Sequence, residues 1–325
     1  MTLPATVAVD VGGTKIRAGS VIDGELAHVR SVPTPATSGA QAVLDTIAEV
    51  TAAVVAEASG SHGGESAWRI GIGAAGVIDP ATGTVVSATD SLPGWAGTDL
   101  VTELSARSGL PVRVVNDVHA HALGEAAAGA SRGTRNSLLV AAGTGIGGGF
   151  ITDGHLLTGR NSAAGHVGHV PSAAASGLAC PCGGTGHVEA IASGPAILNT
   201  YRRLVDASDS PTSTPVAAPV PANTRELAAA ASAGDALAVR AFDIGARALG
   251  SALGGISNIL SPEVIVVGGG LAEMDETWWA PLREAFAAEL IPATSGTQLV
   301  KAELGQDAAL VGAASLWNAE QRETR

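Results

Sequence analysis

The chain has 325 residues, a net charge of −12 and two cysteines, Cys180 and Cys182. The length allows two domains, and the negative charge argues against a nucleic acid or an anionic membrane as partner. No apolar run is long enough to span a bilayer, and the first residues lack a secretory signal. Because cysteines one residue apart suit a structural disulfide poorly, we expect a soluble cytoplasmic protein.

The first predicted elements form a hairpin over residues 6–26, TVAVDVGGTKIRAGSVIDGEL, and residues 137–156, SLLVAAGTGIGGGFITDGHL, echo it. Each stretch has an apolar strand, a Gly/Thr turn, a second strand and then Asp-Gly. Gly12 matches Gly143, and Asp23 matches Asp153 after one gap. A repeat of this length is a fold-level signal, so it predicts two related lobes.

Helices and strands alternate around these hairpins, which predicts an α/β fold. In the first half the predicted elements are a helix over 38–58, a strand over 69–75, a helix over 98–108, a strand over 112–115 and a helix over 118–128. In the second half they are helices over 188–204, 224–232 and 235–260, a strand over 263–267, and helices over 276–290 and 307–320. We expect surface loops over residues 59–66 and 206–223, which are rich in glycine, proline, serine and alanine.

The stretch Asp10-Val-Gly-Gly-Thr-Lys15 lies between the two strands of the first hairpin. Glycines at such a turn let backbone N–H groups approach anionic oxygens. Thr14 adds a hydroxyl and Lys15 a cation, while an Asp at a strand end can hold Mg²⁺, usually through water. An ordinary hairpin with a glycine-rich turn explains the same residues equally well.

Two later glycine turns favour the phosphate interpretation. The second hairpin turns at Gly143-Thr144-Gly145, with Ala141 at the position that matches Asp10, so only the first copy can supply a carboxylate to a metal. Gly268–Gly270 follow the predicted strand 263–267 and suit the close approach of a nucleoside. Together the three turns predict a nucleotide in a cleft between the lobes.

Six motifs in order from residue 8 to residue 270 make the chain resemble the ROK family of sugar kinases and repressors: AVDVGGTK, VNDVHAHALGE, AAGTGIGGG, AAGHVGHV, CPCGGTGHVEAIASG and VIVVGGG. The resemblance implies a two-lobed actin/hexokinase-like (ribonuclease H-like) ATPase fold with an interdomain cleft, ATP with Mg²⁺, and a homodimer. It implies a small domain over 1–116, a larger domain with a zinc motif over 117–306, and a C-terminal helix, 307–325, that packs back on the first. The nucleotide-binding residues that it implies are Asp10, Gly12, Gly13, Thr14, Lys15, Gly143, Thr144, Gly145, Gly269 and Gly270.

Asn116 and Asp117 follow a predicted strand and open a predicted helix. A carboxylate there can take a proton from an attacking sugar hydroxyl, although Asn and Asp are also common helix caps. The resemblance makes Asp117 the catalytic base, Asn116 a sugar ligand and Gly76 a backbone contact to the sugar. The segment 91–95 is a candidate pocket wall.

The cluster of Cys180, Cys182, His187 and His169 offers four nitrogen and sulfur ligands, the set that tetrahedral Zn²⁺ prefers. A metal-free loop is the alternative, and redox chemistry is less favoured because it typically uses Cys-x-x-Cys. The family has a third Cys where this chain has His187. The resemblance makes the zinc structural, with His169 held in one tautomer so that its other nitrogen meets a sugar hydroxyl, and makes Glu189 a further sugar ligand.

The substrate prediction depends on His166. Most glucose-phosphorylating relatives have Glu-x-Gly-His where this chain has His166-Val-Gly-His169, and neutral His can both donate and accept a hydrogen bond. The bacterial N-acetylmannosamine kinases of the family are similar here, so we expect 6-phosphorylation of N-acetylmannosamine, with His166 near the acetamido group. Glucokinase with drift at a tolerant position is the alternative. A sugar-responsive ROK regulator is remoter, since Asp10 leaves no room for a preceding helix-turn-helix.

Overall fold

The computed structural model describes residues 5–62, 67–88, 92–208 and 221–318. Within these residues the chain forms two compact units. The first draws on the described residues within Met1–Arg135, Gly149–Gly165 and Glu303–Arg325, and the second on those within Asn136–Gly148 and His166–Ala302. The first compact unit includes residues 117–128, which the sequence analysis assigns to the larger domain, and the domain boundaries stay a prediction.

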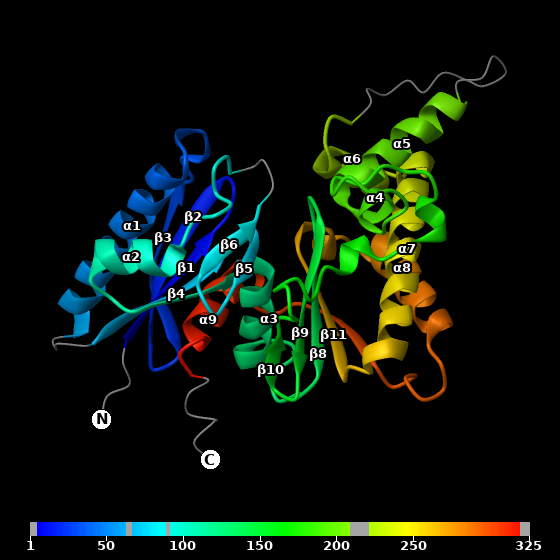
Figure 1. Ribbon diagram of the computed structural model, residues 1–325. Coiled ribbons are helices and arrows are strands. Elements are labelled where there is room, and N and C mark those ends of the chain that lie inside the picture. Colours follow the sequence, from blue (N-terminus) through cyan, green and yellow to red (C-terminus); the bar gives the residue numbers. More distant parts are fainter. Residues whose placement is uncertain (1–4, 63–66, 89–91, 209–220, 319–325) are drawn as a thin grey trace. The chain divides into compact units, whose positions relative to one another are not determined.

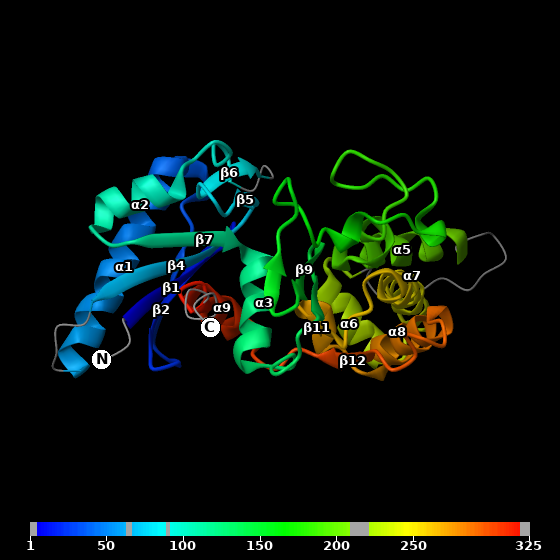
Figure 2. The ribbon, with the colours of Figure 1, turned by 60° about the horizontal axis from the view of Figure 1, so that its bottom comes forward.

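A five-stranded sheet is the centre of the first unit (Figure 1). Its order is β3-β2-β1-β4-β7, with β1 antiparallel to β2 and parallel to β4. The strands are β1 (Ala5–Val11), β2 (Lys15–Ile22), β3 (Glu25–Pro33), β4 (Trp68–Ala74) and β7 (Val112–Asn116), and β5 (Val77–Asp79) with β6 (Thr84–Ser87) form a separate ribbon. Strand β7 leads directly into a helix, which places Asn116 and Asp117 at the carboxyl edge of the sheet (Figure 2).

Four helices accompany this sheet: α1 (Ala40–His62), α2 (Leu100–Ser108), α3 (Asp117–Ala128) and α9 (Ala308–Ser315). Apolar side chains of α1 and α2, such as Leu44 and Leu104, share a core with β1 and β4. Helix α9 packs on β1 and β4 through small residues, and a Cβ on Gly71 would lie 2.0 Å from the Ala313 carbonyl oxygen. Only glycine at position 71 of β4 therefore permits α9 to pack this closely.

The second sheet repeats the first. Its order is β10-β9-β8-β11-β12, with β8 (Ser137–Ala142), β9 (Ile146–Thr152), β10 (His155–Leu157), β11 (Val264–Gly268) and β12 (Gln298–Lys301). Both Asp-Gly turns have two consecutive positive φ angles, 53° and 86° at Asp23-Gly24, and 51° and 82° at Asp153-Gly154. These are the angles of two-residue type I′ hairpin turns. The sequence repeat is confirmed in both the strand order and the turns.

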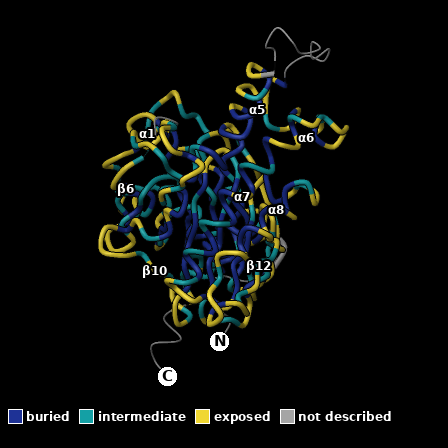
Figure 3. Tube along the Cα trace, turned by 90° about the vertical axis from the view of Figure 1, so that its right-hand side faces the viewer, coloured by how far each residue is buried: buried dark blue, intermediate teal, exposed yellow. Residues whose placement is uncertain are grey.

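The helices of the second unit are α4 (Glu189–Ala192), α5 (Gly194–Ser208), α6 (Thr224–Ser232), α7 (Ala236–Leu260) and α8 (Glu276–Glu289). In Figure 3, buried residues gather along the strands and along α7. Among the described residues, no helix combines the length and the apolar character that crossing a membrane requires.

Several predicted boundaries are wrong. The single helix predicted over 188–204 is two helices, because Ser193 has an extended backbone (φ −71°, ψ 159°) that ends α4 before α5 begins. The loop predicted over 59–66 is helical as far as His62, and residues 63–66 lie outside the described part. Of the loop predicted over 206–223, residues up to Ser208 belong to α5 and 209–220 lie outside the described part.

Candidate functional site

The glycine turn between β1 and β2 is tight. The Gly12 N–H donates to the Lys15 carbonyl oxygen at 3.0 Å, and the Thr34 hydroxyl donates to the Gly12 carbonyl oxygen at 2.7 Å. Thr14 and Lys15 are exposed and Gly13 is half-buried. Because the Gly12 N–H already donates a hydrogen bond within the hairpin, an anion at this turn would contact Gly13, Thr14 and the ammonium of Lys15.

Gln306, which the sequence analysis missed, contacts this turn. Its Oε1 accepts a hydrogen bond from Lys15 Nζ at 2.9 Å, and its carbonyl oxygen accepts one from Arg17. Arg17 also pairs with Asp307 at 2.7 Å. No local signal in residues 303–307 marks them as partners of a hairpin nearly 300 positions earlier.

Asn116 and Asp117 open α3, and both cap it. Asn116 Oδ1 accepts from the backbone N–H groups of Val118 and His119, and Asn116 Nδ2 donates to Gly76 O at 2.8 Å and to Asp117 Oδ1 at 2.8 Å. The Val118 N–H also donates to Asp117 Oδ1, at 2.9 Å. The capping interpretation therefore holds for Asn116, whose side chain orients both Gly76 and Asp117.

The electrostatics of Asp117 suit a proton acceptor. The pKa of its carboxyl is raised from 3.8 to about 6; burial is the main cause, the Val118 N–H acts to lower it, and the charge of Asp10 acts to raise it. The pKa of Asp10 is also raised by burial, against the opposing effects of His121, Arg17 and Lys15. Two adjacent carboxylates that repel each other form a site that a divalent cation would stabilise, so the donor set fits the predicted magnesium.

His119 of α3 and the candidate pocket wall 91–95 also belong to the first unit. His119 is buried, and its Nε2 lies 2.8 Å from Ala164 O. Trp95 is a core residue that donates from Nε1 to Ala75 O at 3.0 Å, so the prediction of a pocket wall is wrong for it, and Ser91 lies outside the described residues.

Glu125, another buried residue of α3, was not predicted. It accepts hydrogen bonds from the backbone of Ala130, Glu303 and Leu304 at 2.7, 3.2 and 2.9 Å. It therefore fixes the segment through which the chain returns to the first unit.

Two glycine turns lie together in the second unit. A Cβ on Gly143 would lie 3.8 Å from the Gly270 N atom, and a Cβ on Gly269, where φ is +87°, would lie 2.4 Å from the Ala142 carbonyl oxygen. Thr144, Gly145, Gly269 and Gly270 are exposed. Gly194, the first residue of α5, donates its N–H to Gly143 O at 2.8 Å. The cradle is lined by backbone, lies beside the N-terminus of α5 and has open space at Gly270, which fits a polyphosphate.

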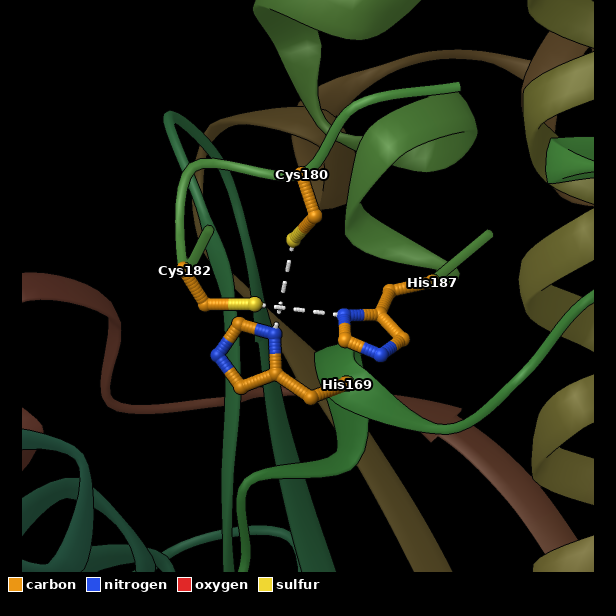
Figure 4. Close-up of side chains that lie close together, drawn as sticks. All are labelled: His169, Cys180, Cys182 and His187. Carbon is orange, nitrogen blue, oxygen red and sulfur yellow. Dashed lines mark hydrogen bonds between the residues drawn. The ribbon is translucent and has the colours of Figure 1, made fainter. Parts of the chain in front are cut away.

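The four predicted metal ligands converge. One ligand atom from each of His169, Cys180, Cys182 and His187 lies within 4.8 Å of the others, and all four point toward a common centre (Figure 4). Cys180 Sγ is 3.7 Å from His169 Nδ1, and Cys182 Sγ is 3.2 Å from His187 Nδ1. Zn–S bonds of ~2.3 Å and Zn–N bonds of ~2.0 Å at tetrahedral angles place S and N about 3.5 Å apart. The separations fit zinc, with His187 in the place of the family's Cys.

The backbone shapes this cluster. The Cys180 N–H donates to Gly184 O at 2.9 Å, and a Cβ on Gly184 would lie 2.7 Å from His187 Cε1. Burial raises the pKa of Cys180 to about 11 and lowers the pKa of His169. These pKa shifts favour the neutral forms of Cys180 and His169 in the absence of a metal. A bound cation would instead favour the thiolate of Cys180.

Glu189 and His166 flank the cluster. Glu189 Oε2 accepts from the Ile146 N–H at 2.7 Å, and Oε1 lies 3.9 Å from Cys180 Sγ. His166 is exposed, and its ring stacks on His169 with centroids 6.0 Å apart. Glu189 thus ties the metal cluster to the glycine turn of β8 and β9, while His166 presents its ring beside a metal ligand.

The ROK family profile matches residues 6–320. The chain belongs to the ROK family. The glucokinase of Halalkalibacterium halodurans is 34% identical over 98% of this chain and 95% of its own length, and the N-acetylmannosamine kinase of Escherichia coli is 32% identical over 97% and 99%.

A solved ROK glucokinase from Streptomyces griseus, in complex with glucose and AMPPNP, is 34% identical with a TM-score of 0.75, covering 96% of this chain and 98% of its own. The predicted actin/hexokinase-like two-lobed α/β fold is confirmed. This member of the ROK family is an ATP-dependent sugar kinase.

Proposed function

We propose that this ROK kinase transfers the γ-phosphate of ATP to the 6-hydroxyl of a hexose, with N-acetylmannosamine as the preferred substrate and Asp117 as the base. The observation that carries the catalytic part is the position of Asp117 at the start of α3, beside Asp10 and with its pKa raised to about 6. A base with a pKa near the working pH combines a large ionised fraction with useful proton affinity.

The proposed step uses one oxygen of Asp117. The Asp117 carboxylate accepts hydrogen bonds from Asn116 Nδ2 and from the Val118 N–H, and both end on Oδ1. The other oxygen, Oδ2, therefore takes the proton of the attacking hydroxyl. The new bond joins the sugar oxygen to phosphorus as the bond to the leaving ADP oxygen breaks. Magnesium, when bound near Asp10, supplies charge neutralisation for the phosphates.

The ATP phosphates are assigned to the glycine turns. In the first unit Gly13, Thr14 and Lys15 are proposed to meet the phosphates, Gly12 to shape the turn through its hydrogen bond to Lys15, and Asp10 to hold the accompanying magnesium. In the second the proposed residues are Gly143, Thr144, Gly145, Gly269 and Gly270, supported by the exposed backbone of the last four and by the N-terminus of α5 beside Gly143.

The sugar is assigned to Gly76, Asn116 and Asp117 of the first unit and to His166, His169 and Glu189 of the second. His169 faces the metal cluster with Nδ1, which leaves Nε2 for a sugar hydroxyl. Bound zinc would fix that tautomer and the direction of the ring. We assign zinc a structural role because four protein side chains would complete its tetrahedral coordination, which leaves no open position for a substrate or a water.

His166 supports N-acetylmannosamine over glucose. Its exposed ring can both donate to an acetamido carbonyl and accept from a hydroxyl, whereas a glutamate there could only accept. Glucokinase is the second candidate, because glucokinase relatives reach 36% identity, slightly above the N-acetylmannosamine kinases at 32%.

Two measurements test these assignments. ADP release across N-acetylmannosamine, N-acetylglucosamine, mannose and glucose should be fastest with N-acetylmannosamine, and a preference for glucose would refute the substrate but leave the kinase standing. In His166→Glu the ratio of kcat/KM for N-acetylmannosamine to that for glucose should fall at least about tenfold, the effect of one hydrogen bond to the substrate. An unchanged ratio would remove His166 from the sugar site.

A further inference from the structure

One face of β2 presents two cations beside a buried carboxylate. Lys15 and Arg17 are two residues apart in β2, so their side chains lie on the same face of the sheet. Arg17 is the cross-strand partner of Asp10 in β1, which places Asp10 on that face as well. Burial raises the pKa of Asp10, and the charges of His121, Arg17 and Lys15 act against that rise. Both cations of β2 therefore attract this carboxylate.

The structure directs both cations elsewhere. Lys15 Nζ donates to Gln306 Oε1 at 2.9 Å, while Arg17 donates to the Gln306 carbonyl oxygen and pairs with Asp307 at 2.7 Å. Among the residues that the structure describes, neither cation forms an ion pair with Asp10. Gln306 thus accepts from one cation with its side chain and from the other with its backbone, and the carboxylate of Asp10 is left for the magnesium assigned to it.

The backbone of Gln306 is held on both sides. It lies in the 3₁₀ turn Gly305–Asp307, directly before α9. Just upstream, the buried carboxylate of Glu125 accepts hydrogen bonds from two consecutive backbone N–H groups. Just downstream, the carboxylate of the next residue pairs with Arg17, whose side chain is only 12% exposed. Because its backbone is anchored in this way, Gln306 offers a fixed acceptor to the longer and exposed side chain of Lys15.

We propose that Gln306 is a positioning residue of the phosphoryl-donor site, which holds the Lys15 ammonium away from Asp10 and directs it to the phosphates of ATP. The inference rests on the proposed function, in which Lys15 meets the phosphates and Asp10 holds magnesium. An ammonium has three N–H donors, so the bond to Gln306 leaves two for phosphate oxygens. A lysine side chain is long and flexible, and a fixed acceptor reduces the entropy that it loses when the ligand binds.

The neutral charge of Gln306 is part of the inference. A carboxylate at this position would also accept a hydrogen bond from Lys15, but its charge would offset the ammonium and repel the phosphates. An amide fixes the direction of the ammonium and leaves its charge for the ligand. Two substitutions separate these properties. Gln306→Glu keeps the acceptor and adds a charge, whereas Gln306→Met keeps the approximate length of the side chain and removes the acceptor.

Calorimetric titration of the full chain with AMPPNP and Mg²⁺, in the absence of sugar, tests the proposal apart from turnover. Lys15→Met should raise the Kd for AMPPNP at least about tenfold, because a hydrogen bond to a charged group is lost. Gln306→Met should raise it about three- to tenfold, the effect of one hydrogen bond, and Gln306→Glu should raise it further. Gln298→Met, at an exposed glutamine of β12, is the matched control and should leave the Kd unchanged.

The double variant shows whether Gln306 acts through Lys15. In the Lys15→Met background, Gln306→Met should change the Kd less than about twofold, because the side chain that Gln306 positions is already absent. In steady-state assays Gln306→Met should raise the KM for ATP, while the KM for the sugar, kcat and the urea midpoint stay near their wild-type values. A role confined to stability would instead lower the urea midpoint.

Three results would overturn the proposal: additive effects of the two Met substitutions, AMPPNP binding by Gln306→Met as tight as by the wild type while Lys15→Met binds more weakly, or tighter binding by Gln306→Glu. An unchanged Kd in Lys15→Met is a different result. It would remove Lys15 from the phosphate contacts of the proposed function, and the inference about Gln306 would fall with that assignment.

Discussion

Asp117→Asn should give a kinase that is more stable and almost inactive. Asn keeps an Oδ1 atom that can accept the hydrogen bonds from Asn116 and Val118, so the cap of α3 is preserved. It removes the ionisable group that burial and Asp10 disfavour. The substitution therefore separates the cost of ionising Asp117 from the packing around it.

The magnitude follows from the pKa. A change from 3.8 in the unfolded chain to about 6 in the folded chain corresponds to about 3 kcal/mol of destabilisation of the folded state once Asp117 is ionised. A raised carboxyl pKa means that the folded state binds the proton more tightly. The penalty is therefore absent below about pH 4, grows through pH 6 and is complete at pH 7. We expect the gain in Asp117→Asn to approach, without exceeding, that value.

The assay is the urea dependence of unfolding, measured for wild type and Asp117→Asn at pH 4, 6 and 8. The difference in the free energy of unfolding should be near zero at pH 4 and largest at pH 8, while kcat falls about 10²–10⁴-fold, the usual contribution of a general base. Equal stabilities at pH 8, or a gain that is the same at every pH, would refute the pKa argument. An unchanged kcat would refute the base.

Four further predictions follow. The logarithm of kcat/KM for the wild type should rise with pH at a slope of one up to about pH 6 and then level off, because the base must be ionised in the free enzyme. A profile that is flat from pH 5 to 8 would argue against Asp117 as the base. Elemental analysis should find one zinc in each chain. Removing the zinc with a chelator should lower the free energy of unfolding by about 4 kcal/mol, compared with the protein in free zinc at a thousand times its Kd. A zinc-free chain of equal stability would exclude the metal. Glu125→Ala leaves three backbone donors unpaired and should cost at least about 3 kcal/mol in urea unfolding, and a loss below about 1 kcal/mol would mean that water replaces the carboxylate. Gly269→Ala should lower the free energy of unfolding by about 1–3 kcal/mol, because its φ is +87°, whereas Gly270→Ala, where a Cβ meets nothing within 4 Å, should leave it almost unchanged. Equal losses of stability would argue against backbone strain at Gly269.

Strong periodicity and turn chemistry explain which elements could be predicted. The helix predicted over 235–260 is α7, and the Asp-Gly turns are both type I′. Strand β3 was missed because it is an edge strand with no fully buried residue and lacks a clear apolar face. The break at Ser193 was missed although Gly194 and Pro195 follow it, a pair that typically marks a helix boundary. In the structure the Gly194 N–H donates to Gly143 O, which holds the chain at this break.

The residues of the site likewise divide into those that could be predicted from the sequence and those that could not. The metal ligands could be predicted because their spacing is local, with three of them within eight residues, and the structure brings in His169 as expected. Asn116 and Asp117 were found from the end of a strand and the start of a helix. The contacts of Gln306 and Glu125 join residues almost 180 to 300 positions apart, and only the folded backbone brings them together.

The composition of the first unit from three separate stretches of chain has a consequence for biosynthesis. The core beneath β1 includes Ala8 but also Leu310, Ala313 and Ala314 of α9, so it stays open until those late residues leave the ribosome. At roughly 5–20 residues per second, that is a delay of about 15–60 seconds after the first strand emerges. The middle of the chain, although made later than β1, is free to fold earlier, and the exposed underside of the first sheet is where a chaperone would bind the nascent kinase.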